Sequence, residues 1–282
     1  MAGFTRLLLM VAVGITLLAQ GTGVPQAQGR EHPVSADEAL RNVQRALRAD
    51  GVRPLTAVYI EADVTKRVYE RSGDFPPTLA FDTDLIIVRP DKFLLRESVP
   101  SGAGHIVTTW GFAGSDLLDN VRVVGSDAQA AMGTVPEVDL PERRRWASRW
   151  LALLSLAGMP EVPLSFTFRG AGEEANRVVY TIDVEGRDDF SARLLIDPET
   201  WLPRQLRHQK RAPAFSSAGS AGAGSARGAT VESTWIPTAY KRVDGIMFPH
   251  RLTEEVLGSV AQDWTVRTIR VNAAVPASAV SR

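Results

Sequence analysis

The feature that most constrains the fold is a period-two alternation of apolar and polar residues that returns along most of the chain. In its first stretch, Val58, Ile60, Ala62 and Val64 alternate with residues that include two carboxylates. This spacing predicts a half-buried β-strand, because successive side chains of a strand point to opposite faces. Similar patterns predict further strands over residues 79–87, 93–97, 106–112, 166–168, 178–184, 192–196, 201–207, 231–243, 248–256 and 264–271.

Turn signals between these stretches predict hairpins, and hence antiparallel pairing. Arg89-Pro90-Asp91-Lys92 suits a type I turn, since proline presets φ at its second position, and Asp244-Gly245 is a hairpin signal. Residues 212–230 are rich in Ala, Gly and Ser, which predicts a flexible loop between two strands. Together these patterns predict an α+β fold that is mainly antiparallel β, with helices on one side of one strongly curved sheet of roughly nine to eleven strands.

Two helices interrupt the strands. The first begins at a capping box, Ser35 to Glu38, presents one apolar face and is expected to stop at Gly51. The second begins at Asp139, with Pro141 in its first turn, and is closed by Gly158. Both helices need a sheet to cover their apolar sides.

The second helix carries the most apolar surface of the chain. Trp146, Trp150 and Leu154 fall on one side of it. One interpretation is core packing against the sheet, and the other is a lid over an apolar cavity.

A basic cluster adjoins this stripe and consists of Arg143, Arg144 and Arg145. A charge run is usually a solvated face. Beside a lid, the same three residues would contact an acidic headgroup or an anionic membrane surface.

The N-terminus predicts export. Arg6 precedes an uncharged run from Leu7 to Ala19, and small residues follow it. Such a run is typical of a secretory signal and is short of the ~20 residues that span a bilayer. We therefore expect a signal peptide over residues 1–29 and one domain over residues 30–282. The chain has no cysteine, so we expect neither disulfides nor a lipid anchor, and a mature protein free in the periplasm or outside the cell.

Composition and motifs argue against several functions. The 32 basic and 32 acidic residues give a net charge of zero, which does not favour nucleic acid as a partner. The four histidines show no metal-ligand spacing, and the pairs Asp82/Asp84 and Asp188/Asp189 are more typical of solvated strands and turns than of a calcium site. No nucleophile elbow or phosphate-binding loop is present, so we expect neither an enzyme nor a cofactor; an esterase would need a serine or aspartate beside His105 or His250.

The order of the elements resembles the LolA/LolB-like superfamily of outer-membrane lipoprotein-sorting proteins, a group that also includes periplasmic stress sensors of the MucB type. The resemblance spans about Ser35 to Val271. Its motifs are Arg89-Pro90-Asp91-Lys92-Phe93, Gly111-Phe112-Ala113-Gly114, Leu195-Ile196-Asp197-Pro198-Glu199-Thr200-Trp201-Leu202-Pro203 and Tyr240-Lys241-Arg242-Val243-Asp244-Gly245-Ile246-Met247-Phe248-Pro249, with a helical insert between the second and the third.

The resemblance implies a half-open β-barrel whose concave apolar face is covered by helices, a cavity for acyl chains and no enzyme activity. No single arginine of this chain aligns with the cavity arginine of the family, so the type of site is transferred and no individual functional residue. Burying an acyl chain is worth roughly 0.8 kcal/mol per CH₂, which is enough for binding without a charged contact. The expected cavity lining is Val58, Ile60, Val64, Leu85, Ile87, Phe93, Leu95, Ile106, Trp110 and Phe112, with Trp146, Trp150 and Leu154 as the lid.

Two functions remain open at this point. The first is a periplasmic carrier of lipid or lipoprotein acyl chains, whose partners would be an acylated lipoprotein and an envelope membrane or receptor protein. The second is a sensor or scaffold on the same fold that binds a protein partner. The lining residues would be a cavity wall in the first case and ordinary core in the second.

Overall fold

The computed structural model describes residues 34–67, 78–89, 91–102, 104–125, 138–211 and 230–273. The described elements belong to one unit that begins at Pro33. The expected signal peptide and all but the last residue of the expected 212–230 loop lie outside the described residues. Among the described helices, none combines the length and the apolar character needed to cross a membrane.

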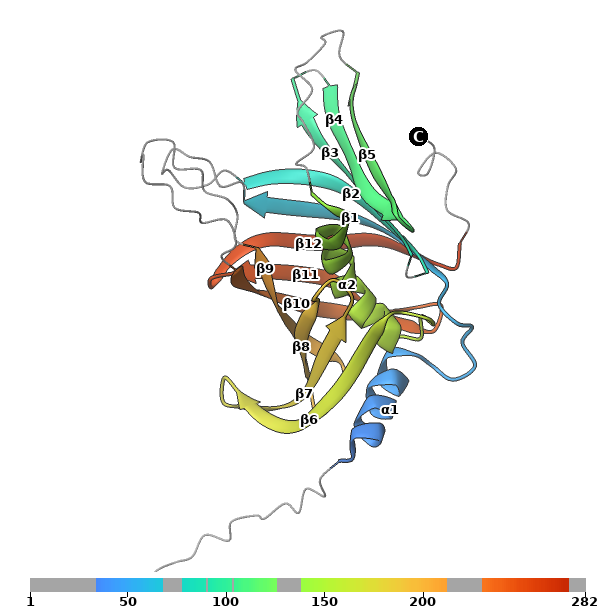
Figure 1. Cartoon of the computed structure of the whole chain (residues 1–282), viewed down its shortest axis with the longest axis vertical. Helices are drawn as coiled ribbons and strands as arrows, with labels where there is room; N and C mark the ends of the chain where they lie inside the picture. Colours follow the sequence, from blue (N-terminus) through green and yellow to red (C-terminus); the bar gives the residue numbers. More distant parts are fainter. Residues whose placement is uncertain are drawn as a thin grey trace, which may run out of the picture. The chain divides into compact units, whose positions relative to one another are not determined.

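Twelve strands form one sheet in the order β5-β4-β3-β2-β1-β12-β11-β10-β9-β8-β7-β6 (Figure 1). All eleven pairings are antiparallel, which confirms the mainly antiparallel β fold class. The strands are β1 (Ala57–Arg67), β2 (Thr78–Val88), β3 (Lys92–Ser101), β4 (Gly104–Ala113), β5 (Asp116–Val124), β6 (Leu164–Glu174), β7 (Arg177–Gly186), β8 (Ser191–Ile196), β9 (Pro203–Arg211), β10 (Thr230–Val243), β11 (Ile246–Val256) and β12 (Ser259–Val271).

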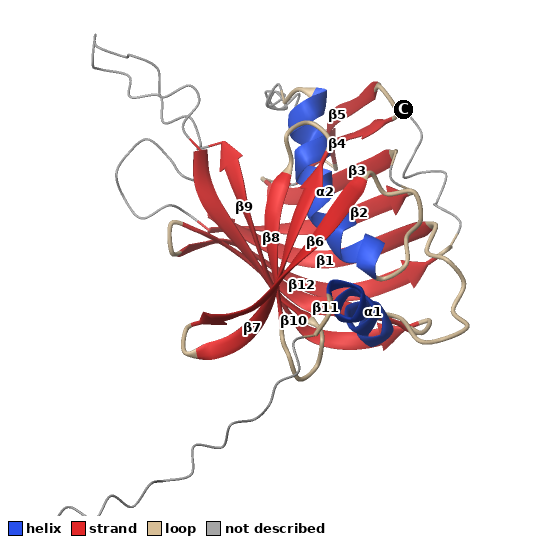
Figure 2. Cartoon of the chain, turned by 60° about the horizontal axis from the view of Figure 1, so that its bottom comes forward, coloured by secondary structure: helices blue, strands red, loops and turns tan. Residues whose placement is uncertain are grey.

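The topology sends the chain from one edge of the sheet to the other. Strands β1 to β5 form one meander and β6 to β12 a second, and the two meanders join where β1 pairs with β12. The edge strands β5 and β6 are consecutive in the chain, so the segment between them must cross the sheet. This segment contains helix α2 (Leu140–Leu156), which contacts both β4 and β6 and lies across one face of the sheet (Figure 2).

The strand register places alternating apolar residues in rows across that face. Val58 is level with Ile87, which is level with Phe93 and then Phe112. Ile60, Leu85, Leu95 and Trp110 form the next row. These rows pack into one core cluster with α2 and with helix α1 (Ala36–Leu47). We call this face, on which α2 lies, the inner face.

Both helices begin where the sequence predicts. The Ser35 hydroxyl accepts a hydrogen bond from the Glu38 backbone N–H at 3.3 Å, and Asp139 Oδ1 accepts from the Glu142 N–H at 2.9 Å. Helix α1 ends at Leu47, before the predicted stop at Gly51. Helix α2 ends just before Gly158, whose φ of +97° is readily adopted only by glycine.

The cap of α2 gives a first prediction. Asp139→Ala removes the acceptor for a free backbone N–H at the first turn, so we expect it to lower the free energy of unfolding by about 1 kcal/mol. The measurement is urea denaturation followed by tryptophan fluorescence. Asp139→Asn, which keeps a capping oxygen, is the control and should stay close to the wild type.

The predicted number of strands is too low, because β5 carries no clear sequence signal. Its residues Asp116–Val124 pair with β4 along the whole strand, yet most of them are exposed or half-buried. An edge strand that buries neither face has no need of apolar alternation. The remaining strands all overlap predicted stretches, and both predicted helices are present.

Candidate functional site

The expected cavity lining lies on the inner face, and most of it is packed. Eight of the ten residues are buried; Ile106 and Trp110 are half-buried. Trp110 packs against the core cluster, whereas Ile106 lies one row beyond the polar residues Thr83 and Glu97. The expected lid residues Trp146, Trp150 and Leu154 cover the same cluster from α2. The structure therefore brings lining and lid together as a filled interior.

Aromatic rings connect α2 to the sheet in a continuous series. Trp146 lies edge-on to Phe93 at 5.1 Å and to Trp110 at 5.0 Å between ring centroids. Trp150 lies edge-on to Trp235 at 5.4 Å and to Trp264 at 5.5 Å. Such T-shaped pairs add about 0.5–1.5 kcal/mol each beyond their buried area, so the tryptophans of α2 contribute to its packing on the sheet.

Three of these tryptophans have unsatisfied donors. The indole N–H groups of Trp150, Trp235 and Trp264 are buried and make no hydrogen bond with any residue that the structure describes. A T-shaped neighbour offers at most a weak N–H···π contact. Because most buried polar atoms in proteins are paired, three neighbouring exceptions in one interior need an explanation.

The three expected headgroup arginines occupy different positions. Arg143 is only 2% exposed, and its guanidinium donates to both carboxylate oxygens of Asp119, at 2.6 and 2.8 Å, and to the Gly111 carbonyl at 3.0 Å. This buried fork joins α2 to β4 and β5, which differs from the expected surface position. Arg144 donates to the Gly114 carbonyl at 2.9 Å, and Arg145 binds Glu142 at 2.5 Å.

A buried polar cluster, absent from the expected site, lies between α2 and the sheet. Arg149 is 4% exposed, and its guanidinium lies 4.8 Å from the Trp146 ring and 5.0 Å from the Trp235 ring. Its Nη1 is 3.7 Å from Glu254 Oε1 on β11. Glu254 also accepts from Lys210 at 2.7 Å and from Ser233 at 2.6 Å, while Gln262 donates to its other oxygen.

Electrostatics fix the charge states of this cluster. Burial alone would raise the pKa of Glu254, but the charges of Arg149 and Lys210, together with the hydrogen bonds from Lys210 and Ser233, lower it to about 2. Burial lowers the pKa of the neighbouring His208 to about 3, and the charge of Arg149 adds to this effect. Glu254 is therefore ionised and His208 neutral at pH 7.

One pocket opens directly onto this cluster, and we call it the rim pocket. Its volume is about 280 Å³. It is lined by Glu142, Arg145, Trp146, Arg149, Asp189, Phe190, His208, Gln209, Lys210 and Thr230. The pocket thus combines two aromatic side chains with a cationic inner end.

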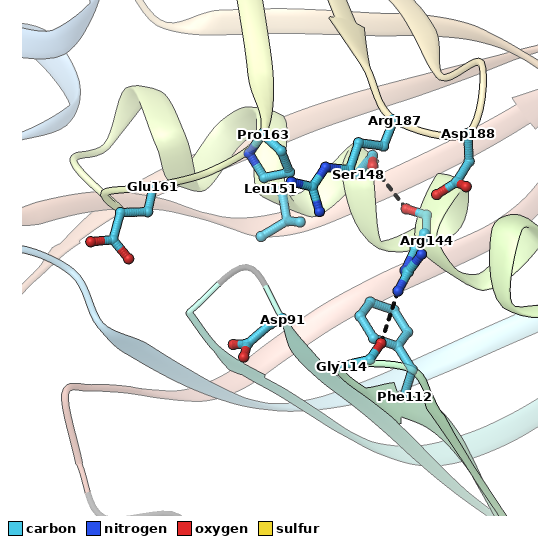
Figure 3. A pocket seen from close by; sticks show the side chains of 10 residues that line it. All are labelled: Asp91, Phe112, Gly114, Arg144, Ser148, Leu151, Glu161, Pro163, Arg187 and Asp188. Carbon is cyan, nitrogen blue, oxygen red and sulfur yellow. Dashed lines mark hydrogen bonds between the residues drawn. The ribbon is translucent and has the colours of Figure 1, made fainter.

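A second pocket lies at the other side of α2 and is smaller, at about 190 Å³ (Figure 3). Phe112 and Leu151 are its main apolar residues, and charged side chains from three loops surround it, among them Asp91, Glu161 and Arg187. Arg144 of α2 donates to Gly114, just after β4, so this pocket lies between α2, the end of β4 and the turn that contains Asp91.

The alternative chemistries find little support in the described residues. No group of three His, Asp or Glu side chains there is arranged to hold a metal ion. Asp82 is paired with Arg267, and Asp84 with Tyr59 and Arg96. Ser98 Oγ lies 3.4 Å from His105 Nδ1, a loose contact on an exposed strand surface, and no described carboxylate orients the ring as a catalytic triad would require.

Comparisons with known proteins find a likeness of structure only. No family model matches the chain, and no curated protein matches it. A LolA superfamily protein from Nitrosomonas europaea is 11% identical with a TM-score of 0.46, over 88% of this chain and 98% of that one. A putative outer membrane lipoprotein-sorting protein domain from Vibrio parahaemolyticus is 11% identical with a TM-score of 0.45, over 86% and 96%.

A DUF1329 family protein from Desulfovibrio piger is 13% identical with a TM-score of 0.41, over 87% of this chain and 96% of that one. The superfamily of the first protein is the one that the order of the sequence motifs resembles. The chain is structurally similar to LolA superfamily and lipoprotein-sorting domains at low sequence identity.

Proposed function

We propose that this chain is a non-catalytic periplasmic carrier that holds the acyl chains of a lipid or lipoprotein between α2 and the inner face. In this proposal the sheet is a half-open barrel and α2 is its lid. The three unsatisfied indole donors of Trp150, Trp235 and Trp264 carry the argument. An ester or amide carbonyl of an acylated ligand would accept hydrogen bonds that the closed interior does not supply.

The position of α2 in the chain supports the role of a lid. It is the crossing connection between two edge strands, so no strand pairing is lost when it moves away from the inner face. An acyl chain would then replace the aromatic contacts of α2, at roughly 0.8 kcal/mol for each CH₂ that it buries. Arg144 and Arg145, on the first half of the helix and outside the core cluster, are the proposed contacts for an acidic headgroup or membrane surface.

The first experiment identifies the ligand. The protein is purified from a periplasmic fraction without detergent, its organic extract is analysed by mass spectrometry, and the stripped protein is titrated with a fluorescent fatty acid. We expect a stoichiometric acylated molecule, and saturable uptake of the fatty acid. A lipid-free protein that takes up no fatty acid contradicts the carrier function.

The indole donors give a sharper prediction. Trp150→Phe removes one donor but keeps an aromatic ring, so we expect it to weaken binding of an acyl ester by about 1 kcal/mol, or roughly fivefold. The matched control is Trp201→Phe, since Trp201 stacks on Tyr180 in the β8–β9 connection, outside the lid. Equal affinities of the two variants in a fluorescence titration would contradict ester binding at Trp150.

A second candidate function is a scaffold that binds a protein partner, and the edge strand β5 favours it. Leu117 and Val124 of β5 are exposed apolar residues on a strand that pairs on one side only. Such an edge accepts an added strand from another chain. A stoichiometric protein partner cross-linked to β5, together with a lipid-free interior, would favour the scaffold over the carrier.

A further inference from the structure

We propose that the rim pocket binds a singly charged oxyanion, a phosphodiester or a carboxylate, that also carries a hydroxyl or amide N–H donor. This inference rests on the proposed carrier function only for the source of the anion, which would be the headgroup of the acylated ligand. The pocket adjoins Trp146 of the lid, so an attached chain would continue from the pocket under α2.

The first observation is the state of Arg149. This side chain is almost fully buried and lines the pocket, and its Nε donates to the Trp146 carbonyl at 3.2 Å. Its Nη1 is 3.7 Å from Glu254, beyond hydrogen-bond length, and neither Nη group has a hydrogen bond to a described residue. A guanidinium fixed between two aromatic rings with free terminal N–H groups is suited to bidentate binding of an oxyanion.

The second observation is His208, which is 6% exposed and lines the same pocket. Its Nδ1 donates to the Gln209 carbonyl at 3.2 Å, because a carbonyl can only accept. Its Nε2 is buried without a hydrogen bond to any described residue. In the neutral ring this nitrogen is an acceptor, so the matching ligand supplies a donor next to its anionic group.

The remaining charges define how much negative charge the pocket accepts. Lys210 binds Glu254 through one of its three N–H groups and can donate the others into the pocket. Of the two carboxylates that line the pocket, Glu142 is paired with Arg145, and Asp189 is exposed at the mouth. A second negative charge would face Asp189, so a singly charged group fits better than a phosphomonoester.

The volume sets the size of the group. At about 280 Å³ the pocket is just below the ~300–1,000 Å³ of pockets for drug-sized ligands. A glycerol phosphodiester fits this size and chemistry, whereas the acyl chains must lie elsewhere. Phosphatidylglycerol has such a headgroup, with one negative charge and free hydroxyls.

The test compares two lysolipids with the same acyl chain, lysophosphatidylglycerol and lysophosphatidylcholine, by calorimetry below their critical micelle concentrations. Both lysolipids contain a phosphodiester and a free hydroxyl on the acylated glycerol. The phosphocholine headgroup adds a quaternary cation and has no hydroxyl or N–H donor of its own, so it has no net charge. We expect the wild type to bind lysophosphatidylglycerol at least about tenfold more tightly, since charge-assisted hydrogen bonds are the strong ones. Lys210→Met and His208→Leu should each reduce that preference several-fold, chiefly by weakening the binding of lysophosphatidylglycerol.

The control is Lys241→Met, the same substitution at an exposed lysine of β10 that does not line the pocket. Its preference should equal that of the wild type. Equal binding of the two lysolipids by the wild type would overturn a site that selects a net negative charge together with a headgroup donor, while leaving acyl binding in place.

A last titration, with glycerophosphoglycerol, separates the two sources of the anion. In one outcome the wild type binds this chain-free headgroup, Lys210→Met does not, and neither lysolipid binds. That outcome would support the oxyanion site and overturn the acyl carrier. Failure of all three ligands would overturn both proposals.

Discussion

Glu254→Gln is expected to lower the free energy of unfolding by about 3 kcal/mol, because it leaves the buried Arg149 without a carboxylate. The side chains of Arg149 and Glu254 are 5% and 4% exposed, so water compensates only weakly for the lost charge. Lys210, the other cation of Glu254, has a side chain that is 26% exposed and can turn to solvent. Urea denaturation of the wild type and the variant at pH 7 measures the difference.

Two further variants test whether the loss of stability comes from the burial of this ion pair. Glu174→Gln removes the carboxylate of the ion pair with Arg207, where the Glu174 side chain is 37% exposed, and such surface pairs contribute about 0–1 kcal/mol. The double variant Arg149→Met/Glu254→Gln removes both buried charges and should recover most of the loss. If Glu254→Gln is as stable as Glu174→Gln, the prediction that the buried ion pair holds α2 to β11 is contradicted.

In the proposed carrier, the Arg149–Glu254 pair would let α2 be stable on the sheet and still able to move. The aromatic contacts of α2 are made with apolar rings that an acyl chain could replace, whereas the Arg149–Glu254 contact joins one charge on α2 to one charge on β11. Replacing a buried ion pair by apolar side chains is often neutral for stability, so such a pair is better understood as a device that specifies position. In the proposed carrier it would return α2 to one place after the ligand leaves.

The fold could be predicted from the sequence because alternation and caps act locally. Val58, Ile60 and Val64 lie on the inner face as their spacing predicts, and Asp139 caps α2 as its position before Pro141 predicts. Strand β5 could not be found in this way, since an edge strand that buries neither face leaves no pattern. Alternation also cannot separate a filled core from a cavity wall, because both require the same inward apolar residues.

The sequence contains a signal for the polar cluster, namely charged residues at inward-facing positions. Glu254 lies between Leu252 and Val256, two residues from each, so the alternation that buries these two also buries the carboxylate. Arg149 follows Trp146 by one helical turn and so shares its side of α2. A charged residue at an inward position of a strand indicates a partner across the core, although the sequence alone does not identify that partner.

The second large effect is on the pH dependence of stability, and it comes from His208. Burial and the charge of Arg149 hold its pKa at about 3 in the folded protein, against about 6.5 in an unfolded chain. Between these values the unfolded state binds the proton and the folded state does not, so stability falls as the pH is lowered through this window. From pH 7 to pH 5 we expect the wild type to lose about 2 kcal/mol through this residue.

His208→Gln removes the titrating group and should be nearly flat over the same interval, while His105→Gln, at an exposed site of β4, should follow the wild type. Glu254, Arg149 and Lys210 face His208. Glu254 and Arg149 keep their charges between pH 5 and 7, since the pKa of Glu254 is lowered to about 2 and that of Arg149 only to about 10. Urea denaturation at half-unit steps of pH measures the slopes. A wild type as flat as His208→Gln would mean that solvent or an anionic group stabilises the protonated ring in the folded state. The acceptor that we assign to the rim pocket would then be lost.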